Sequence, residues 1–125
     1  MAATIKTNTT DERREGNGVY VWEKHIEFVT PNATHAAQIA NIPINGVLQK
    51  IIVVCPATQA TGKTFTFTID DDNDVEIFAL GATAENDTYI YNVTEPLNGV
   101  IDITIDFNAS VGTTDHTLSL YLRGV

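Results

Sequence analysis

Alternation of apolar and polar residues is the clearest pattern in this chain. Between residues 64 and 69, three threonines alternate with Phe65, Phe67 and Ile69. The segments 100–107 and 116–123 alternate in the same way, with Ile, Phe or Leu at every second position of their apolar side. A period of two is typical of a strand with one buried and one solvated face. These three segments therefore predict an antiparallel sheet that is dry on one side.

Weaker patterns extend this prediction over most of the chain. The segment 18–30 has its large apolar residues on one parity, and 47–54 is an almost continuous apolar run. Segments 75–80 and 88–93 are short strand candidates, whereas 36–42 favours either a strand or a short helix. Residues typical of turns and loops separate these segments at Pro31-Asn32, Asn45-Gly46, Asp70–Asn73, 81–87 and Glu95–Gly99.

About eight short strands separated by turn signals predict an all-β fold. We expect one antiparallel β-sandwich of the jelly-roll type, because eight strands fit two sheets in that arrangement. The segment 64–80 would then be a hairpin formed by the fourth and fifth strands. The last strand, 116–123, would lie between the first and the third strand, near the middle of one sheet.

The N-terminal residues lack any periodicity. Residues 1–17 contain four threonines and then a charged stretch. We predict a flexible arm at residues 1–17, followed by a β-sandwich domain at residues 18–125. The alternative is an arm that becomes ordered on a partner or on a neighbouring subunit.

Charge is distributed unevenly along the 125 residues, whose formal net charge is −9. Residues 1–24 carry four basic and four acidic side chains, so they sum to zero. Residues 25–125 carry three basic and twelve acidic side chains, which accounts for the whole −9. Such a domain repels nucleic acid and anionic lipid. We therefore expect neither as a partner, and instead expect basic surfaces, neutral surfaces or cations.

Cys55 is the single cysteine, so the chain has no internal disulfide. It ends a strand that reads as buried, which favours a core residue over a reactive thiol. The N-terminus lacks the apolar segment of a secretory signal, and no run is long enough for a membrane span. We therefore expect a protein that is made in the cytoplasm.

The acidic turn after residue 69 is the strongest candidate for a metal site. Asp70, Asp72 and Asp74 could supply oxygen ligands to a hard cation such as Ca²⁺. The turn lacks the glycine of an EF-hand loop, however, and neighbouring side chains diverge in a tight turn. We therefore favour a solvated turn whose Asp and Asn side chains bind their own backbone, and we predict no metal and no other cofactor.

Catalytic motifs are missing from the sequence. The three histidines, His25, His35 and His116, lie in separate segments without metal-ligand spacing. The residues around Lys63 lack the first glycine of a P-loop, and no serine lies in a nucleophile elbow. We predict that the chain is not an enzyme.

Aromatic side chains are the candidates for a binding surface. Where exposed, they would anchor a protein interface, and a coplanar set would bind sugar rings. The same residues are also common in cores. The candidates are Tyr20, Trp22, Tyr89, Tyr91 and Tyr121.

Four pieces in this order give the chain a family likeness. A Thr-rich arm precedes FTFTIDDDNDVEIF at 65–78, PLNGVIDITI at 96–105 and HTLSLYLRGV at 116–125. The chain thereby resembles the small all-β virion proteins of tailed bacteriophages, the capsid decoration or auxiliary proteins. The resemblance implies a jelly-roll-like, non-enzymatic and often trimeric protein that binds a capsid lattice. It carries no site residues to this chain.

These observations lead to one expectation and one alternative. We expect a structural protein of the virion, a decoration protein on the phage head that forms a homo-oligomer such as a trimer. Its partner would be the major capsid protein or another virion protein. The alternative is a carbohydrate-binding β-sandwich module, with or without Ca²⁺, from a phage tail or a larger enzyme.

Overall fold

The computed structural model describes residues 4–8, 14–16, 19–30, 37–57, 63–108 and 116–125, with side chains from Val21 onward. These residues form eight strands, and every pairing between them is antiparallel. The predicted all-β fold is therefore confirmed. The strands are β1 (Thr4–Asn8), β2 (Arg14–Gly16), β3 (Val19–Thr30), β4 (Gln38–Cys55), β5 (Thr64–Asp70), β6 (Glu76–Ala84), β7 (Asp87–Phe107) and β8 (His116–Gly124).

Two long strands fold the sheet into two layers. The strand order is β1-β3-β8-β4-β7-β5-β6, with β2 also paired to β3. The second half of β4 pairs with β8 and with the start of β7, whereas its first half pairs with the end of β7. That end of β7 also pairs with β5. One layer thus contains β3, β8, the second half of β4 and the first half of β7, and the other contains the remaining halves with β5 and β6. This arrangement is a jelly-roll-like sandwich, as predicted.

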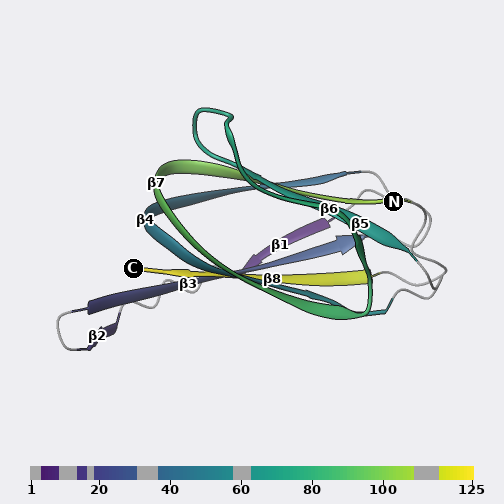
Figure 1. Cartoon of the computed structure of the whole chain (residues 1–125), viewed down its shortest axis with the longest axis horizontal. Coiled ribbons are helices and arrows are strands. Elements are labelled where there is room, and N and C mark those ends of the chain that lie inside the picture. Colours follow the sequence, from purple (N-terminus) through teal and green to yellow (C-terminus); the bar gives the residue numbers. More distant parts are fainter. Residues whose placement is uncertain (1–3, 9–13, 17–18, 31–36, 58–62, 109–115) are drawn as a thin grey trace.

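The bend between the layers corrects two turn predictions. Asn45-Gly46 and Glu95–Gly99 read as turns, but β4 has 18 residues and β7 has 21, and both continue through these positions. The two signals face each other, with Asn45 opposite Asn98. Gly46 and Gly99 have φ angles of 148° and 125°, where side chains are disfavoured. The turn residues therefore serve as bends where both strands change layer together (Figure 1).

Two other predictions need correction. The loop expected at 81–87 is mostly strand, because β6 reaches Ala84 and only two residues link it to β7. The N-terminal segment, expected to lack regular structure, places β1 and β2 against β3. Backbone hydrogen bonds form such pairs without apolar alternation, so periodicity gave no signal there. The flexibility of this arm and its boundary at residue 18 stay predictions.

The core lies between the two layers. The inward side chains of β8, Leu118, Leu120 and Leu122, are fully buried. β8 lies between β3 and the second half of β4, which confirms the predicted place of the last strand. The predicted hairpin of β5 and β6 is also confirmed. Cys55 is buried as expected, and burial raises the pKa of its thiol to about 12.

Candidate functional site

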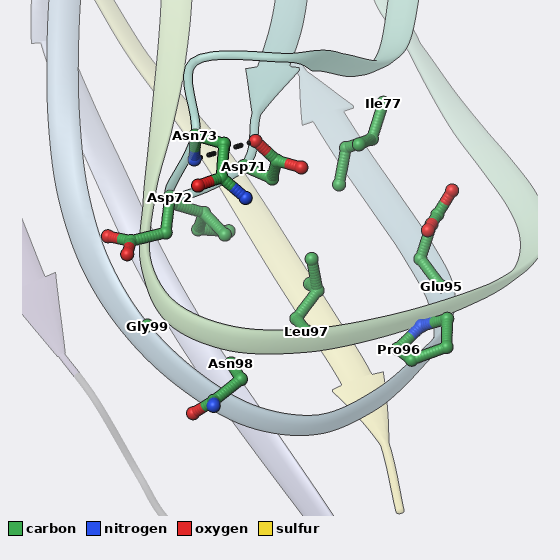
Figure 2. Close-up of a pocket in the computed structure, with 10 residues that line it drawn as sticks. Asp71, Asp72, Asn73, Ile77, Glu95, Pro96, Leu97, Asn98 and Gly99 are labelled. Carbon is green, nitrogen blue, oxygen red and sulfur yellow. Dashed lines mark hydrogen bonds between the residues drawn. The ribbon is translucent and has the colours of Figure 1, made fainter.

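A pocket of about 330 Å³ lies where the turn after β5 meets the bend of β7. Figure 2 shows Asp71, Ile77, Glu95 and Leu97 around it. Leu97 is buried and Ile77 packs against the core, whereas most of the accessible lining of the pocket is polar. The residues that line the pocket are Asp71, Asp72, Asn73, Ile77, Glu95, Pro96, Leu97, Asn98, Gly99 and Ile101.

Asp71 builds the turn at one side of this pocket. Its Oδ1 accepts hydrogen bonds from the backbone N–H groups of Asn73 (2.8 Å) and Val75 (3.0 Å). The Asp71 backbone N–H also donates to the carbonyl of Val75 at 2.9 Å. Asp74 has a φ of 59°, which Asp tolerates better than most residues. The turn is therefore closed by its own side chain, in agreement with the favoured interpretation from the sequence.

Asp72 attaches this turn to β7. Its Oδ1 accepts a hydrogen bond of 3.2 Å from the backbone N–H of Val100. A Cβ atom at Gly99 would lie 2.7 Å from the Asp72 Cγ, so only glycine allows this close approach. In Figure 2 the Asp72 side chain accordingly lies beside Gly99, on the other side of the turn from Ile77 and Glu95.

The three candidate metal ligands are not gathered around one point. Asp70 ends β5, opposite Glu76 and Asp102, whereas Asp72 binds the bend of β7. No group of three or more His, Cys, Asp or Glu side chains among the described residues could hold a metal ion. The expectation that the chain needs no metal or cofactor stays a prediction.

Charge and shape define what the pocket can accept. Its lining includes three carboxylates, from Asp71, Asp72 and Glu95, and no Lys, Arg or His. An ammonium or guanidinium group, or a hydroxylated ligand, would suit such oxygens. The lining has no aromatic ring, so a sugar ring could not stack there.

The five candidate aromatic residues fall into different environments. Trp22 is 4% exposed, so it belongs to the core and is not an exposed interface anchor. The side chain of Tyr20 lies outside the described residues. Tyr121 is half-buried on the outer face of its layer and stacks on His25, with ring centroids 4.3 Å apart. Among the candidates whose side chains are described, only Tyr89 and Tyr91 share one surface.

That surface is an apolar seam that the sequence analysis missed. We name it the edge seam, and its six residues are partly buried hydrophobics packed against the core. The buried core residues, in contrast, are each at most 7% exposed. Phe78 and Tyr91 join β6 to β7, with ring centroids 5.2 Å apart. The edge seam consists of Ile77, Phe78, Leu80, Tyr89, Tyr91 and Val93.

The edge seam ends at the pocket, because Ile77 belongs to both and Glu95 follows Val93 by two residues. A signal for it was present in the sequence. Residues 77–84 and 88–94 contain no charged residue and no proline. That composition becomes meaningful only when both segments are known to be sheet edges.

The described histidines form no catalytic group. His116 is buried, and its Nε2 lies 2.7 Å from the carbonyl oxygen of Pro56. His25 on β3 lies opposite Tyr121 on β8, whereas His116 on β8 lies opposite Thr30 on β3. His35 lies outside the described residues. None of the described residues forms a helix with the length and hydropathy needed to cross a membrane.

The geometry defines the class of protein, a jelly-roll-like β-sandwich. The chain matches no protein-family model. It matches no curated protein either.

Solved structures share this fold. A protein of Bacillus endospore appendages, which form disulfide-linked pili, aligns with 100% of this chain and 91% of its own, at 11% identity and a TM-score of 0.50. The module CBM51 from Clostridium perfringens GH95 was solved in complex with methyl-galactose. It aligns with 98% of this chain and 89% of its own, at 14% identity and a TM-score of 0.53. The VP2 chain of a subviral particle of infectious bursal disease virus aligns with 98% of this chain and 32% of its own, at 14% identity and a TM-score of 0.45. At these identities the likeness shows the fold alone.

Proposed function

We propose that this chain is a non-enzymatic structural protein of a bacteriophage virion, which binds the capsid surface as a decoration protein. The observation that carries the proposal is the edge seam. A sandwich of this size can close its core, yet among the described residues six apolar side chains of β6 and β7 are only partly buried against it. An apolar surface of this kind is typical of a protein that completes its packing on a partner.

Two further observations support an assembling protein. The domain carries the entire net charge of −9, which keeps decorated particles from adhering to one another. The pilus protein that aligns with the whole chain is also part of a larger assembly. We propose the major capsid protein or another virion protein as the partner, and a homo-oligomer such as a trimer as the bound form.

Co-sedimentation tests this proposal directly. Capsids that lack the protein are mixed with the full chain and with a chain that lacks residues 1–17. We expect saturable binding of the full chain, with light scattering showing a mass above that of one chain. If the deletion variant folds but does not bind, the arm carries the contact. Failure of the full chain to bind would refute the virion role.

The second candidate function is carbohydrate binding. The observation in its favour is the pocket beside Glu95, whose carboxylate and amide groups could bind sugar hydroxyls. CBM51, of the same fold, was solved with methyl-galactose. The lack of an aromatic ring in the lining places this candidate second.

Calorimetric titration with methyl-galactose, with and without Ca²⁺, separates the two functions. If the chain binds carbohydrate, we expect a heat of binding that is lost in the Glu95→Gln variant. The heat should be kept in Asp106→Asn, which changes an exposed acid on the same strand. If millimolar sugar gives no heat of binding and the chain binds capsids, the virion role is the only one of the two functions that is supported.

A further inference from the structure

The first half of β7 is an open strand edge with unusual composition. Among the described strands, residues 87–92 pair with β4 only and β6 pairs with β5 only. Open edges expose unpaired N–H and C=O groups, and soluble proteins usually guard them with lysine, proline or bulges. Residues 88–94, Thr-Tyr-Ile-Tyr-Asn-Val-Thr, have no charge and no proline. This edge is therefore suited to pair with another strand.

The other described edges are better protected. β1 covers the edge of β3 over Thr4–Asn8, and β1, the outermost strand, is only five residues long and contains Lys6. The first half of β4 contains Pro43, which has no N–H to offer. The pairing of β6 with β5 shifts register twice, whereas the pairing of the β7 edge with β4 shifts once, between Asn92 and Glu95, so the β7 edge is the more regular template. The β7 edge is thus the best template among them.

Side chains on both faces of this edge would gain contacts from an added strand. Tyr89, Tyr91 and Val93 belong to the edge seam and are only partly buried. Ile90 points to the opposite face and is 59% exposed. A strand with uncharged, β-forming residues would bury apolar area on both sides of the sheet.

Charges at the ends of the edge select the kind of partner. Asp87 and Glu95 bracket residues 88–94. If two copies paired antiparallel about Tyr91, each Asp87 would lie opposite a Glu95, and like charges directly opposite destabilise a sheet. Pairing with β6 of a second copy would bring Glu76 or Glu85 to the same ends. The acids therefore oppose self-pairing and favour a strand with basic ends.

We propose that the β7 edge at residues 88–94 binds an extended strand of a partner protein, with about seven uncharged β-forming residues flanked by Lys or Arg. This inference rests on the proposed function and names the chemistry of the capsid-side segment. One basic end would lie beside Glu95, at the acidic pocket where Asp71 also lies. The other would lie beside Asp87.

Labelled peptides test the strand and its charges with the intact protein. The probe is the nine-residue peptide KVTVTVTVK, compared with EVTVTVTVE by fluorescence anisotropy. We expect the Lys-ended peptide to bind at least about fivefold more tightly, because two exposed ion pairs replace two repulsions. Equal affinities would overturn the inference.

Backbone methylation tests for strand pairing without changing the protein. Two versions of the Lys-ended peptide are compared. One carries N-methyl groups on its valines, which occupy every second position, and the other carries them on the intervening threonines. In an added strand only one of these sets donates to β7. We expect one methylated peptide to bind and the other to fail, and equal behaviour of the two would refute strand addition.

Hydrogen exchange and one pair of variants locate the site. The peptide should slow amide exchange at residues 88–94 and not along Gln38–Ile44, the control edge on β4. Neutralising Asp87→Asn with Glu95→Gln should weaken binding about fivefold, whereas Asp102→Asn with Asp106→Asn removes equal charge from the same strand and should not. Protection of 88–94 by self-association alone would show that a second copy occupies the edge, and would overturn the inference.

Capsid binding separates this inference from the proposed function. If the Asp87→Asn, Glu95→Gln variant no longer co-sediments with capsids, both the virion role and the strand site on β7 are supported. Retained co-sedimentation by that variant refutes the strand site while the virion role stands. Failure of the unmodified chain to bind capsids refutes the virion role, whatever the peptides do.

Discussion

The two sides of the sandwich differ in how completely their apolar side chains are buried. On the side of the C-terminus, Val47 and Val125 exchange backbone hydrogen bonds of 2.8 and 3.0 Å, and the Trp22 Nε1 donates to the Val125 carbonyl at 3.1 Å. On the side of β6 and β7, the edge seam is half-buried. The first side is closed by hydrogen bonds from Val47 and Trp22 to Val125, whereas on the second side the described residues bury the edge seam only in part. The side at Val125 therefore holds the core together, whereas the edge seam keeps apolar area that the described residues bury only in part.

Truncating a leucine on each side should give the largest contrast. Leu120 is fully buried on β8, and Leu120→Ala should lower the free energy of unfolding by about 2–5 kcal/mol. Leu80 of the edge seam is only partly buried, so Leu80→Ala should cost about 1 kcal/mol. Urea unfolding of both variants measures the difference. Equal losses would mean that the edge seam is as much part of the core as β8.

Adding one methyl group at a glycine on each side should give the next largest contrast. A Cβ at Gly124 would lie 1.9 Å from the carbonyl oxygen of Val47 and 2.6 Å from Cζ2 of Trp22. Gly124→Ala should therefore destabilise by about 1–3 kcal/mol. At Gly81, in β6, nothing lies within 4 Å, and Gly81→Ala should change stability by less than about 0.5 kcal/mol. Thermal unfolding of both variants checks this, and a stable Gly124→Ala protein would contradict the close packing.

Removing one hydrogen bond from the side at Val125 should have a smaller effect. Trp22→Phe keeps an aromatic ring in the core but deletes the Nε1 donor to Val125. We expect a loss of about 1 kcal/mol in chemical unfolding. Tyr91→Phe in the edge seam is the matched control and should be neutral. A neutral Trp22→Phe would show that the bond to the C-terminal residue does not stabilise the fold.

High pH should reveal the buried thiol and have no effect near neutrality. Burial raises the pKa of Cys55 from 9.0 to about 12. The folded state therefore holds this proton more tightly than the unfolded state, so stability is unaffected below pH 9 and falls as the pH rises from 9 toward 12. Cys55→Ala should show a shallower fall over that range. A thiol reagent that modifies native Cys55 rapidly at pH 8 would contradict its burial.

Much of the fold could be predicted because its signals are local. The alternation at 64–69 and 116–123 depends on neighbouring residues, and in the structure Phe65, Phe67 and Leu120 point into the core. The bends could not be predicted in this way. Asn45-Gly46 and Asn98-Gly99 are ordinary turn signals, and they become bends because the two strands bearing them are paired.

The candidate site was predicted only in part. Asp71 and Asp72 were recognised as turn residues, and Tyr89 and Tyr91 were among the interface candidates. The pocket beside Glu95 was missed, because it exists only where the turn after β5 meets β7, more than twenty residues later. Trp22 had the composition of an interface anchor, and its burial depends on packing against the far end of the chain.

By itself the sequence determined that the alternating segments, such as 64–69 and 116–123, form strands, which faces of them are dry, and that the domain is acidic. These properties follow from period-two patterning and from side-chain charge, which require no knowledge of distant residues. Only the tertiary structure decided where the strands bend, which of them lie at an edge, and that Ile77, Phe78 and Tyr91 remain half-buried. Edges and pockets are made by the absence or presence of a neighbour in space, and in this fold paired residues lie as much as 102 residues apart, as Trp22 and Gly124 do.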